Sequence, residues 1–132
     1  MSGVQELRLV ITVDDFDAAV AFYRDALGLE ELDAWQAEPG GHIVILRAGA
    51  ATLELVDEAQ AAAIDAVEVG RRVAGPVRVA FEVDDSGASA ARLEQAGGEV
   101  LGGPVETPWK DVNVRVRAPD GMQLTLFSSL DG

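Results

Sequence analysis

The sequence has 132 residues, enough for one compact domain or two very small ones, and its hydrophobic share of 48% is enough for a core. It contains no cysteine, which excludes disulfides, thiolate catalysis and cysteine-ligated metal sites. The formal net charge of −13 disfavours nucleic acid and anionic membranes as partners, although it also serves solubility and is compatible with a cationic ligand. Without a signal-like start or a membrane-length apolar run, we expect a cytoplasmic protein.

The first half of the chain predicts a strand, a helix and three further strands. A β-rich run at 7–13 leads into Asp14 and Asp15, which supply a helix N-cap. Gly28 ends this helix. Strand signals follow in LEELDAWQ and in GHIVILRAGAATLELVD, the latter read as two strands with a turn near Gly49. The apolar stripe of the helix consists of Phe16, Val20, Tyr23 and Leu27.

The second half predicts the same order of elements after a connection at 57–76, in which EAQAAAIDAV favours a short helix. A β-rich run at 77–83 leads into a second Asp-Asp pair and a helix that glycine ends. Strand signals then follow in GEVLGGPVE and in VNVRVRAPDGMQLTLFSS, with a turn at 119–121.

The two halves are therefore an internal repeat of a βαβββ module, over about 5–57 and 75–129. When residue n is aligned with residue n + 70, segments 7–28 and 77–98 are identical at 8 of 22 positions. A half of about 60 residues is too small to be stable alone, so the modules should share a core or pair between chains. We expect one α+β domain over 1–132. The identical pairs are Arg8/Arg78, Val13/Val83, Asp14/Asp84, Asp15/Asp85, Ala18/Ala88, Ala21/Ala91, Ala26/Ala96 and Gly28/Gly98.

Three segments carry a resemblance to a known family: VDDFDAAVAFYRDALGLE, VAFEVDDSGASAARLEQAGGEV and TPWKDVNVRVRAPDGMQLTLF. With them the chain resembles the vicinal oxygen chelate superfamily, which groups glyoxalase I, bleomycin-resistance proteins and extradiol dioxygenases. The resemblance implies two βαβββ modules whose curved mixed sheets enclose a cavity. It also implies a homodimer, because many members are dimers.

Metal-dependent members of that family bind a divalent ion through four side chains, usually two histidines and two glutamates. The matching positions here hold Arg8, Glu54, Arg78 and Thr125. An arginine stays protonated and cannot donate a lone pair to a metal, and one carboxylate with one hydroxyl is a poor transition-metal site. We therefore expect no metal and no cofactor. The only histidine, His42, lies outside the matched positions and is expected to be a surface or wall residue.

Charges that face a cavity must be paired or hydrated, which leaves two interpretations of Arg8, Glu54 and Arg78. In the first, Glu54 lies between the arginines in an ion cluster that locks the modules together. In the second, the excess positive charge anchors a carbonyl, phenolate or carboxylate of a ligand. The two interpretations are compatible.

Two tryptophans complete the predicted ligand site. Trp35 falls in the second strand region and Trp109 in the connection VETPWKDV, which the family uses to line the cavity mouth. Either could pack in the core, but in binding relatives aromatic side chains sandwich flat ligand rings. The predicted ligand-binding residues are Arg8, Trp35, Glu54, Arg78, Trp109 and Thr125.

Three functions follow from this set. The first is non-catalytic binding that sequesters an aromatic or peptide-derived antibiotic or natural product and so confers resistance, as the bleomycin-resistance branch implies. The second is a metal-independent lyase or isomerase, in which Glu54 acts as a base and an arginine stabilises an enolate. The third is a ligand sensor or a subunit without catalysis of its own. The first is the favoured prediction, with a small planar ligand as the partner.

Overall fold

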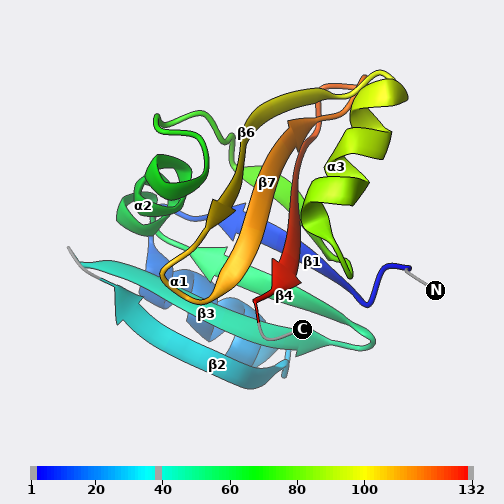
Figure 1. Ribbon diagram of the computed structural model, residues 1–132. Helices are drawn as coiled ribbons and strands as arrows, with labels where there is room; N and C mark the ends of the chain where they lie inside the picture. The colour runs from blue at the N-terminus through cyan, green and yellow to red at the C-terminus, as the bar shows by residue number, and fades with distance from the viewer. Residues whose placement is uncertain (1–2, 38–39, 131–132) are drawn as a thin grey trace.

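The computed structural model describes residues 3–37 and 40–130 and contains an α+β fold with one curved, unclosed eight-stranded sheet (Figure 1). Each α-helix begins where an aspartate caps it, as the sequence predicts for the two repeated helices. Asp15 and Asp85 each accept a 3.0 Å hydrogen bond from the backbone N–H three residues later. The elements of the first half are β1 (Glu6–Thr12), α1 (Phe16–Val20), η1 (Ala21–Ala26), β2 (Glu30–Ala37), β3 (Gly41–Ala48) and β4 (Ala51–Val56). Those of the second half are α2 (Glu58–Glu68), β5 (Val77–Glu82), α3 (Ser86–Gln95), β6 (Glu99–Glu106), β7 (Asp111–Arg117) and β8 (Gln123–Ser129).

The strand order is β2-β3-β4-β1-β5-β8-β7-β6, so each βαβββ module forms one half of the sheet. Within the modules β1 pairs with β4 and β5 pairs with β8 in parallel, and the modules meet where β1 and β5 pair antiparallel. Of the two arrangements left open by the sequence, pairing within one chain is thus the one present here. One unpredicted detail is η1, a π-helical continuation of α1.

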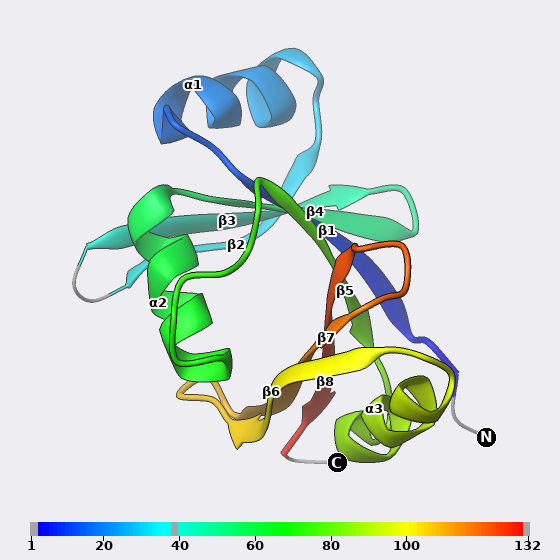
Figure 2. The same ribbon diagram turned by 90° about the horizontal axis from the view of Figure 1, so that it is seen from above.

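Three hydrophobic clusters hold the helices to the sheet. α1 covers the first module around Leu46 and Leu55, and α3 covers the second around Val114 and Val116. α2 packs through Ile64 on the remaining cluster, which draws residues from both modules. In Figure 2 the sheet bends into an incomplete barrel, with α2 on its open side and α1 and α3 outside.

Two glycines allow α2 to approach the sheet closely. A Cβ atom at Gly41 of β3 would lie 2.6 Å from the Gln60 Cα, and one at Gly102 of β6 would lie 2.1 Å from the Glu68 carbonyl oxygen. Any side chain at either position would therefore collide with the helix backbone. α2 is thereby held against both modules, where it forms one wall of the cavity described below.

Among the helices of the described residues, none is both long and apolar enough to cross a membrane.

Candidate ligand-binding site

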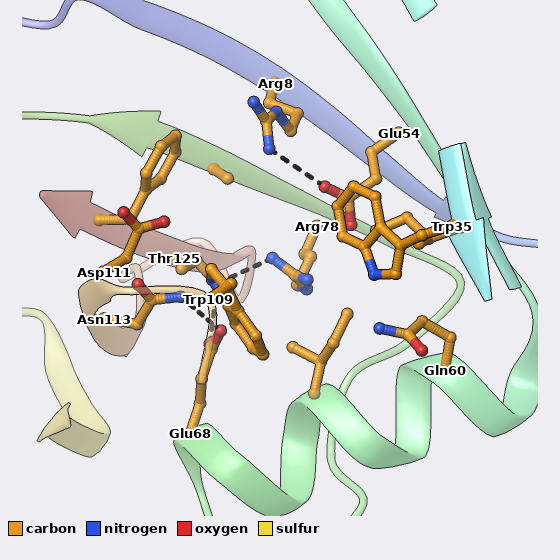
Figure 3. A pocket seen from close by; sticks show the side chains of 14 residues that line it. Arg8, Trp35, Glu54, Gln60, Glu68, Arg78, Trp109, Asp111, Asn113 and Thr125 are labelled. Atoms are coloured by element: carbon orange, nitrogen blue, oxygen red, sulfur yellow. Dashed lines mark hydrogen bonds and ion pairs between the residues drawn. The ribbon is translucent and has the colours of Figure 1, made fainter. Parts of the chain in front are cut away.

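A cavity of about 80 Å³ lies between α2 and the inner face of the sheet (Figure 3). All six residues predicted from the sequence line it, although they come from six different segments of the chain. The structure thus brings the predicted set together, while ligand binding by these residues stays a prediction. The lining consists of Arg8, Trp35, Ile43, Glu54, Gln60, Ile64, Glu68, Arg78, Ala80, Trp109, Asp111, Asn113, Thr125 and Phe127.

Arg8 of β1 is paired with neighbouring side chains. Its Nη2 lies 3.0 Å from Glu6 Oε2, its Nη1 lies 3.4 Å from Glu54 Oε1, and its Nε donates to Thr52 Oγ1 at 3.2 Å. The guanidinium carbon also lies 5.3 Å from the centroid of the Phe127 ring, within range of a cation–π contact. Because its charge is matched by two carboxylates of the first module, Arg8 needs no ligand to balance it.

Arg78 of β5, at the equivalent position of the repeat, has no such neighbours. Its side chain is buried, and Nη1 donates to Thr125 Oγ1 at 2.8 Å. Within residues 3–37 and 40–130, no carboxylate lies within 4.0 Å of this guanidinium. Burial lowers the pKa of Arg78, and the negative charges of Glu68 and Glu54 offset this only in part. The group stays protonated and is a buried cation with donors available to the cavity.

Glu54 is influenced by the charges of both arginines but forms an ion pair with only one of them. Glu54 of β4 forms an ion pair with Arg8, but Arg78 is beyond ion-pair distance. Burial raises the pKa of Glu54, while the charges of Arg78 and Arg8 act in the opposite direction. The three residues also do not lock the modules together as one ion cluster, because the Arg8–Glu54 pair lies within the first module.

A second, fully buried ion cluster beneath the cavity was not anticipated. Arg115 of β7 has no exposed surface, and its Nη1 donates to Asp65 Oδ1 at 2.9 Å and to Gln123 Oε1 at 3.0 Å. Its Nε donates to Glu68 Oε1 at 3.0 Å, and Asn113 Nδ2 donates to Glu68 Oε2 at 2.8 Å. The cluster fixes α2 to the second module.

Asp65 of α2 also anchors the segment that follows the helix. Its Oδ2 accepts hydrogen bonds from the backbone N–H of Val73 at 2.7 Å and of Ala74 at 2.8 Å. The same oxygen forms an ion pair with Arg72 at 3.0 Å. Burial acts to raise the pKa of Asp65, but these backbone donors and the charge of Arg115 outweigh burial and lower it. Asp65 is thus ionised in the folded protein.

Thr125 of β8 links this cluster to Arg78. Its Oγ1 lies 3.2 Å from Glu68 Oε1, the acceptor for its single O–H donor, and accepts from Arg78 at 2.8 Å and from Arg115 at 3.2 Å. One donor and two lone pairs are then all in use. Thr125 lines the cavity, but its hydroxyl positions Arg78 and has no free capacity for a ligand.

Trp35 of β2 and Trp109, in the turn between β6 and β7, both line the cavity. Each is 41% exposed, so the alternative that either tryptophan packs in the core is wrong. Their partial exposure places aromatic surface where the cavity meets solvent. His42 lies outside the lining, half-exposed, with Nδ1 at 2.8 Å from Asp57 Oδ2, as expected for a surface residue.

Several lining residues were missed, although the sequence contains signals for them. Gln60, Ile64 and Glu68 recur every four residues and share one face of α2. Every second position of β7 holds a polar residue, Asp111, Asn113 and Arg115, so the three share one face of the sheet. Burial raises the pKa of Asp111, which lies near the exposed edge of the site.

The side chains at the family's four metal positions do not fit a divalent ion. Two are guanidiniums, the Thr125 hydroxyl is saturated, and Glu54 alone offers a free pair of electrons. Nor do the described residues contain any other group of three or more histidine, cysteine, aspartate or glutamate side chains that could hold a metal.

Similar proteins agree with this architecture. A hypothetical protein from Bacillus halodurans superposes with a TM-score of 0.70 at 17% identity, covering 97% of this chain and 94% of that one. Methylmalonyl-CoA epimerase from Mycobacterium tuberculosis superposes with a TM-score of 0.67 at 20% identity, covering 96% of this chain and 89% of that one. Both likenesses show a shared fold.

A further similar structure is a variant of Streptomyces coelicolor methylmalonyl-CoA epimerase in complex with 2-nitronate-propionyl-CoA. Its TM-score is 0.67 at 25% identity, with 96% of this chain and 99% of that one covered. No protein with a curated description matches the sequence. Residues 7–126 match the family profile described as Glyoxalase/Bleomycin resistance protein/Dioxygenase superfamily. The chain belongs to this superfamily.

Proposed function

We propose that this protein binds a small molecule with a flat aromatic part, holds it through an acidic or carbonyl edge, and releases it unchanged. One observation supports this most strongly: Arg78 is a buried cation that faces the cavity, and its one hydrogen bond within the described part of the chain goes to the neutral Thr125. The charges of Glu68 and Glu54 compensate this buried cation only in part, without a direct ion pair, and a ligand with an anionic or carbonyl oxygen would add the missing contact.

The aromatic part of the ligand is inferred from the two tryptophans. They are the only ones in the sequence, and both lie at the cavity. Their rings offer large contact area and lose little conformational freedom on binding, so a flat ring stacked on either would gain affinity. Phe127 adds a third aromatic side chain to the lining.

The size of the cavity limits how such a ligand could sit. About 80 Å³ is small beside the roughly 300–1,000 Å³ of pockets that enclose a drug-sized molecule. An acidic head group would enter, the ring would lie against the tryptophans, and the rest would extend into solvent. An aromatic or peptide-derived antibiotic or natural product could be sequestered in this way, because sequestration requires affinity and no catalytic group.

A second candidate function is favoured by Glu54. Its raised pKa, caused by burial, is a property of carboxylates that act as bases near neutral pH. In a metal-independent isomerase, Glu54 would take a proton from the carbon next to a carbonyl and Arg78 would stabilise the enolate oxygen. Return of the proton to either face of that carbon would complete the reaction without a change of redox state. The 25% identity to an epimerase is compatible with this chemistry.

The test begins with native mass spectrometry of the purified protein, to identify a co-purifying small molecule. That molecule is then incubated with the protein in D₂O. Stoichiometric binding of an aromatic acid or carbonyl compound that is recovered unchanged and without deuterium supports the binding function. Deuterium at the carbon next to its carbonyl, lost in Glu54→Gln, contradicts it and supports the isomerase.

A further inference from the structure

The side-chain amide of Gln60 is buried and makes no hydrogen bond within residues 3–37 and 40–130. It lies in the first turn of α2, and its side chain is 4% exposed and lines the cavity. Its backbone N–H is bonded to the capping Asp57, but neither end of its amide makes a hydrogen bond to another described residue. Of its two polar atoms only Oε1 is buried without a partner, so Nε2 is the end that a molecule in the cavity can reach (Figure 3).

The two ends of this amide are placed differently. Oε1 is inaccessible to solvent and lies beside Gly41, where an added Cβ would come within 2.7 Å of it. Nε2 points into the cavity, toward the side occupied by the Arg78 guanidinium (Figure 3). Two sets of donors, one from α2 and one from β5, therefore face the same space.

We infer that Gln60 Nε2 and the free N–H groups of Arg78 together bind one carboxylate of the ligand, which makes the ligand class a planar aromatic carboxylic acid. This inference rests on the proposed function, which requires only Arg78 and an acidic or carbonyl edge. A carboxylate that leaves water needs several donors, because each oxygen accepts about two hydrogen bonds. Arg78 supplies the charge, and Gln60 supplies a neutral donor from the opposite wall.

The orientation of the amide gives the inference a direct alternative. Rotation by 180° about the last side-chain bond would present Oε1 to the cavity, which would favour a head group that donates hydrogen bonds, such as a carboxamide. Matched probes that differ only in this group separate the two cases. The probes are 2-naphthoate and 2-naphthamide, with benzoate and indole-3-carboxylate to vary the ring.

The experiment is calorimetric titration of the wild type, Gln60→Leu and Arg78→Met with both naphthalene probes. Gln60→Leu removes both polar groups at similar volume. It should weaken 2-naphthoate about tenfold and 2-naphthamide less, because a hydrogen bond to a charged carboxylate is stronger than one to a neutral carbonyl. Gln95→Leu, an exposed position at the end of α3, should change neither. Thermal melts check folding. If Gln60→Leu does not fold, Gln60→Met takes its place.

The outcomes separate this inference from the function on which it rests. If Arg78→Met weakens 2-naphthoate but Gln60→Leu and Gln60→Met do not, the carboxylate clamp is wrong and the proposed function stands. If Gln60→Leu weakens 2-naphthamide more than 2-naphthoate, the amide acts as an acceptor and the carboxylate class is wrong. If the wild type binds neither the three carboxylates nor 2-naphthamide at millimolar concentration, the proposed function fails together with the clamp.

Discussion

Arg8 and Arg78 occupy equivalent positions of the repeat and differ in their partners. Arg8 has two carboxylates, a threonine hydroxyl and an aromatic ring around its guanidinium. Among the residues that the structure describes, Arg78 has one hydrogen bond, to Thr125. The same residue at the same place in two copies of one module is thus neutralised in the first copy and left open to the cavity in the second.

The difference originates in the neighbouring strands and in α2. In the first module β1 and β4 supply Glu6 and Glu54 to their own arginine. In the second module the position equivalent to Glu54 is Thr125, and the nearby Glu68 is bonded to Arg115. The role of a duplicated side chain is therefore decided by its local charge balance and cannot be inferred from the repeat alone.

The largest predicted effect is a loss of stability, and it comes from the buried ion cluster of Arg115, which also bonds Thr125, the partner of Arg78. Arg115→Met should lower the free energy of unfolding by about 3–5 kcal/mol, because it leaves Asp65 and Glu68 buried without their counter-ion. Urea unfolding measures this. Arg117→Met is the matched control, since Arg117 forms an exposed pair with Glu99 worth at most about 1 kcal/mol. Similar losses in the two variants would contradict the role of the cluster.

A smaller effect is expected at the mouth of the site. Trp109→Ala should weaken binding of 2-naphthoate by about 1–2 kcal/mol, roughly tenfold, because a stacking surface is lost. The melting temperature should change little, since the side chain is 41% exposed. Phe22→Ala, at an exposed aromatic outside the cavity, should leave affinity unchanged. Unchanged affinity in Trp109→Ala removes this tryptophan from the site, and a collapsed melting temperature would contradict its placement at the cavity mouth.

The smallest effect is a pH dependence that distinguishes Glu54 from ordinary surface glutamates. Burial raises the pKa of Glu54 in the folded state above its usual 4.5, so its contribution to stability is full below that pH and is lost as pH rises through the folded-state pKa. Glu54→Gln cannot ionise and should gain melting temperature relative to wild type between pH 4 and pH 7. Glu94→Gln, on the exposed surface of α3, is the control. If the melting temperature of Glu54→Gln falls relative to wild type as the pH rises, the ion pair with Arg8 outweighs the cost of burying the Glu54 charge.

Much of the fold could be predicted from the sequence, because its signals are local and occur in both copies of the repeat. The aspartate caps, the glycine turns and the strand runs all appear where the repeat predicts them, including the turn at 119–121 and the short helix in the connection. The π-helical turn η1 could not be predicted, since nothing in Ala21–Ala26 separates it from an ordinary helix. The homodimer stays a prediction, and a sedimentation mass near 13.9 kDa would contradict it.

The site was only partly predictable. Family resemblance placed the strand residues correctly in one cavity, because strand register fixes which side chains face inward. The contribution of α2 was missed, since Gln60 and Glu68 reach the cavity only after the helix folds back across the sheet. The unequal partners of Arg8 and Arg78 likewise depend on distances between strands that the sequence does not contain.

The most direct test of the central claim compares Arg78→Met with Arg8→Met in titrations with 2-naphthoate. Arg78→Met should weaken binding at least about 30-fold, because a buried charge that pairs with the ligand is lost. Arg8→Met should stay within about threefold of wild type, since Arg8 is already neutralised within the protein. Equal losses in the two variants, or a larger loss in Arg8→Met, would contradict the assignment of Arg78 as the arginine reserved for the ligand.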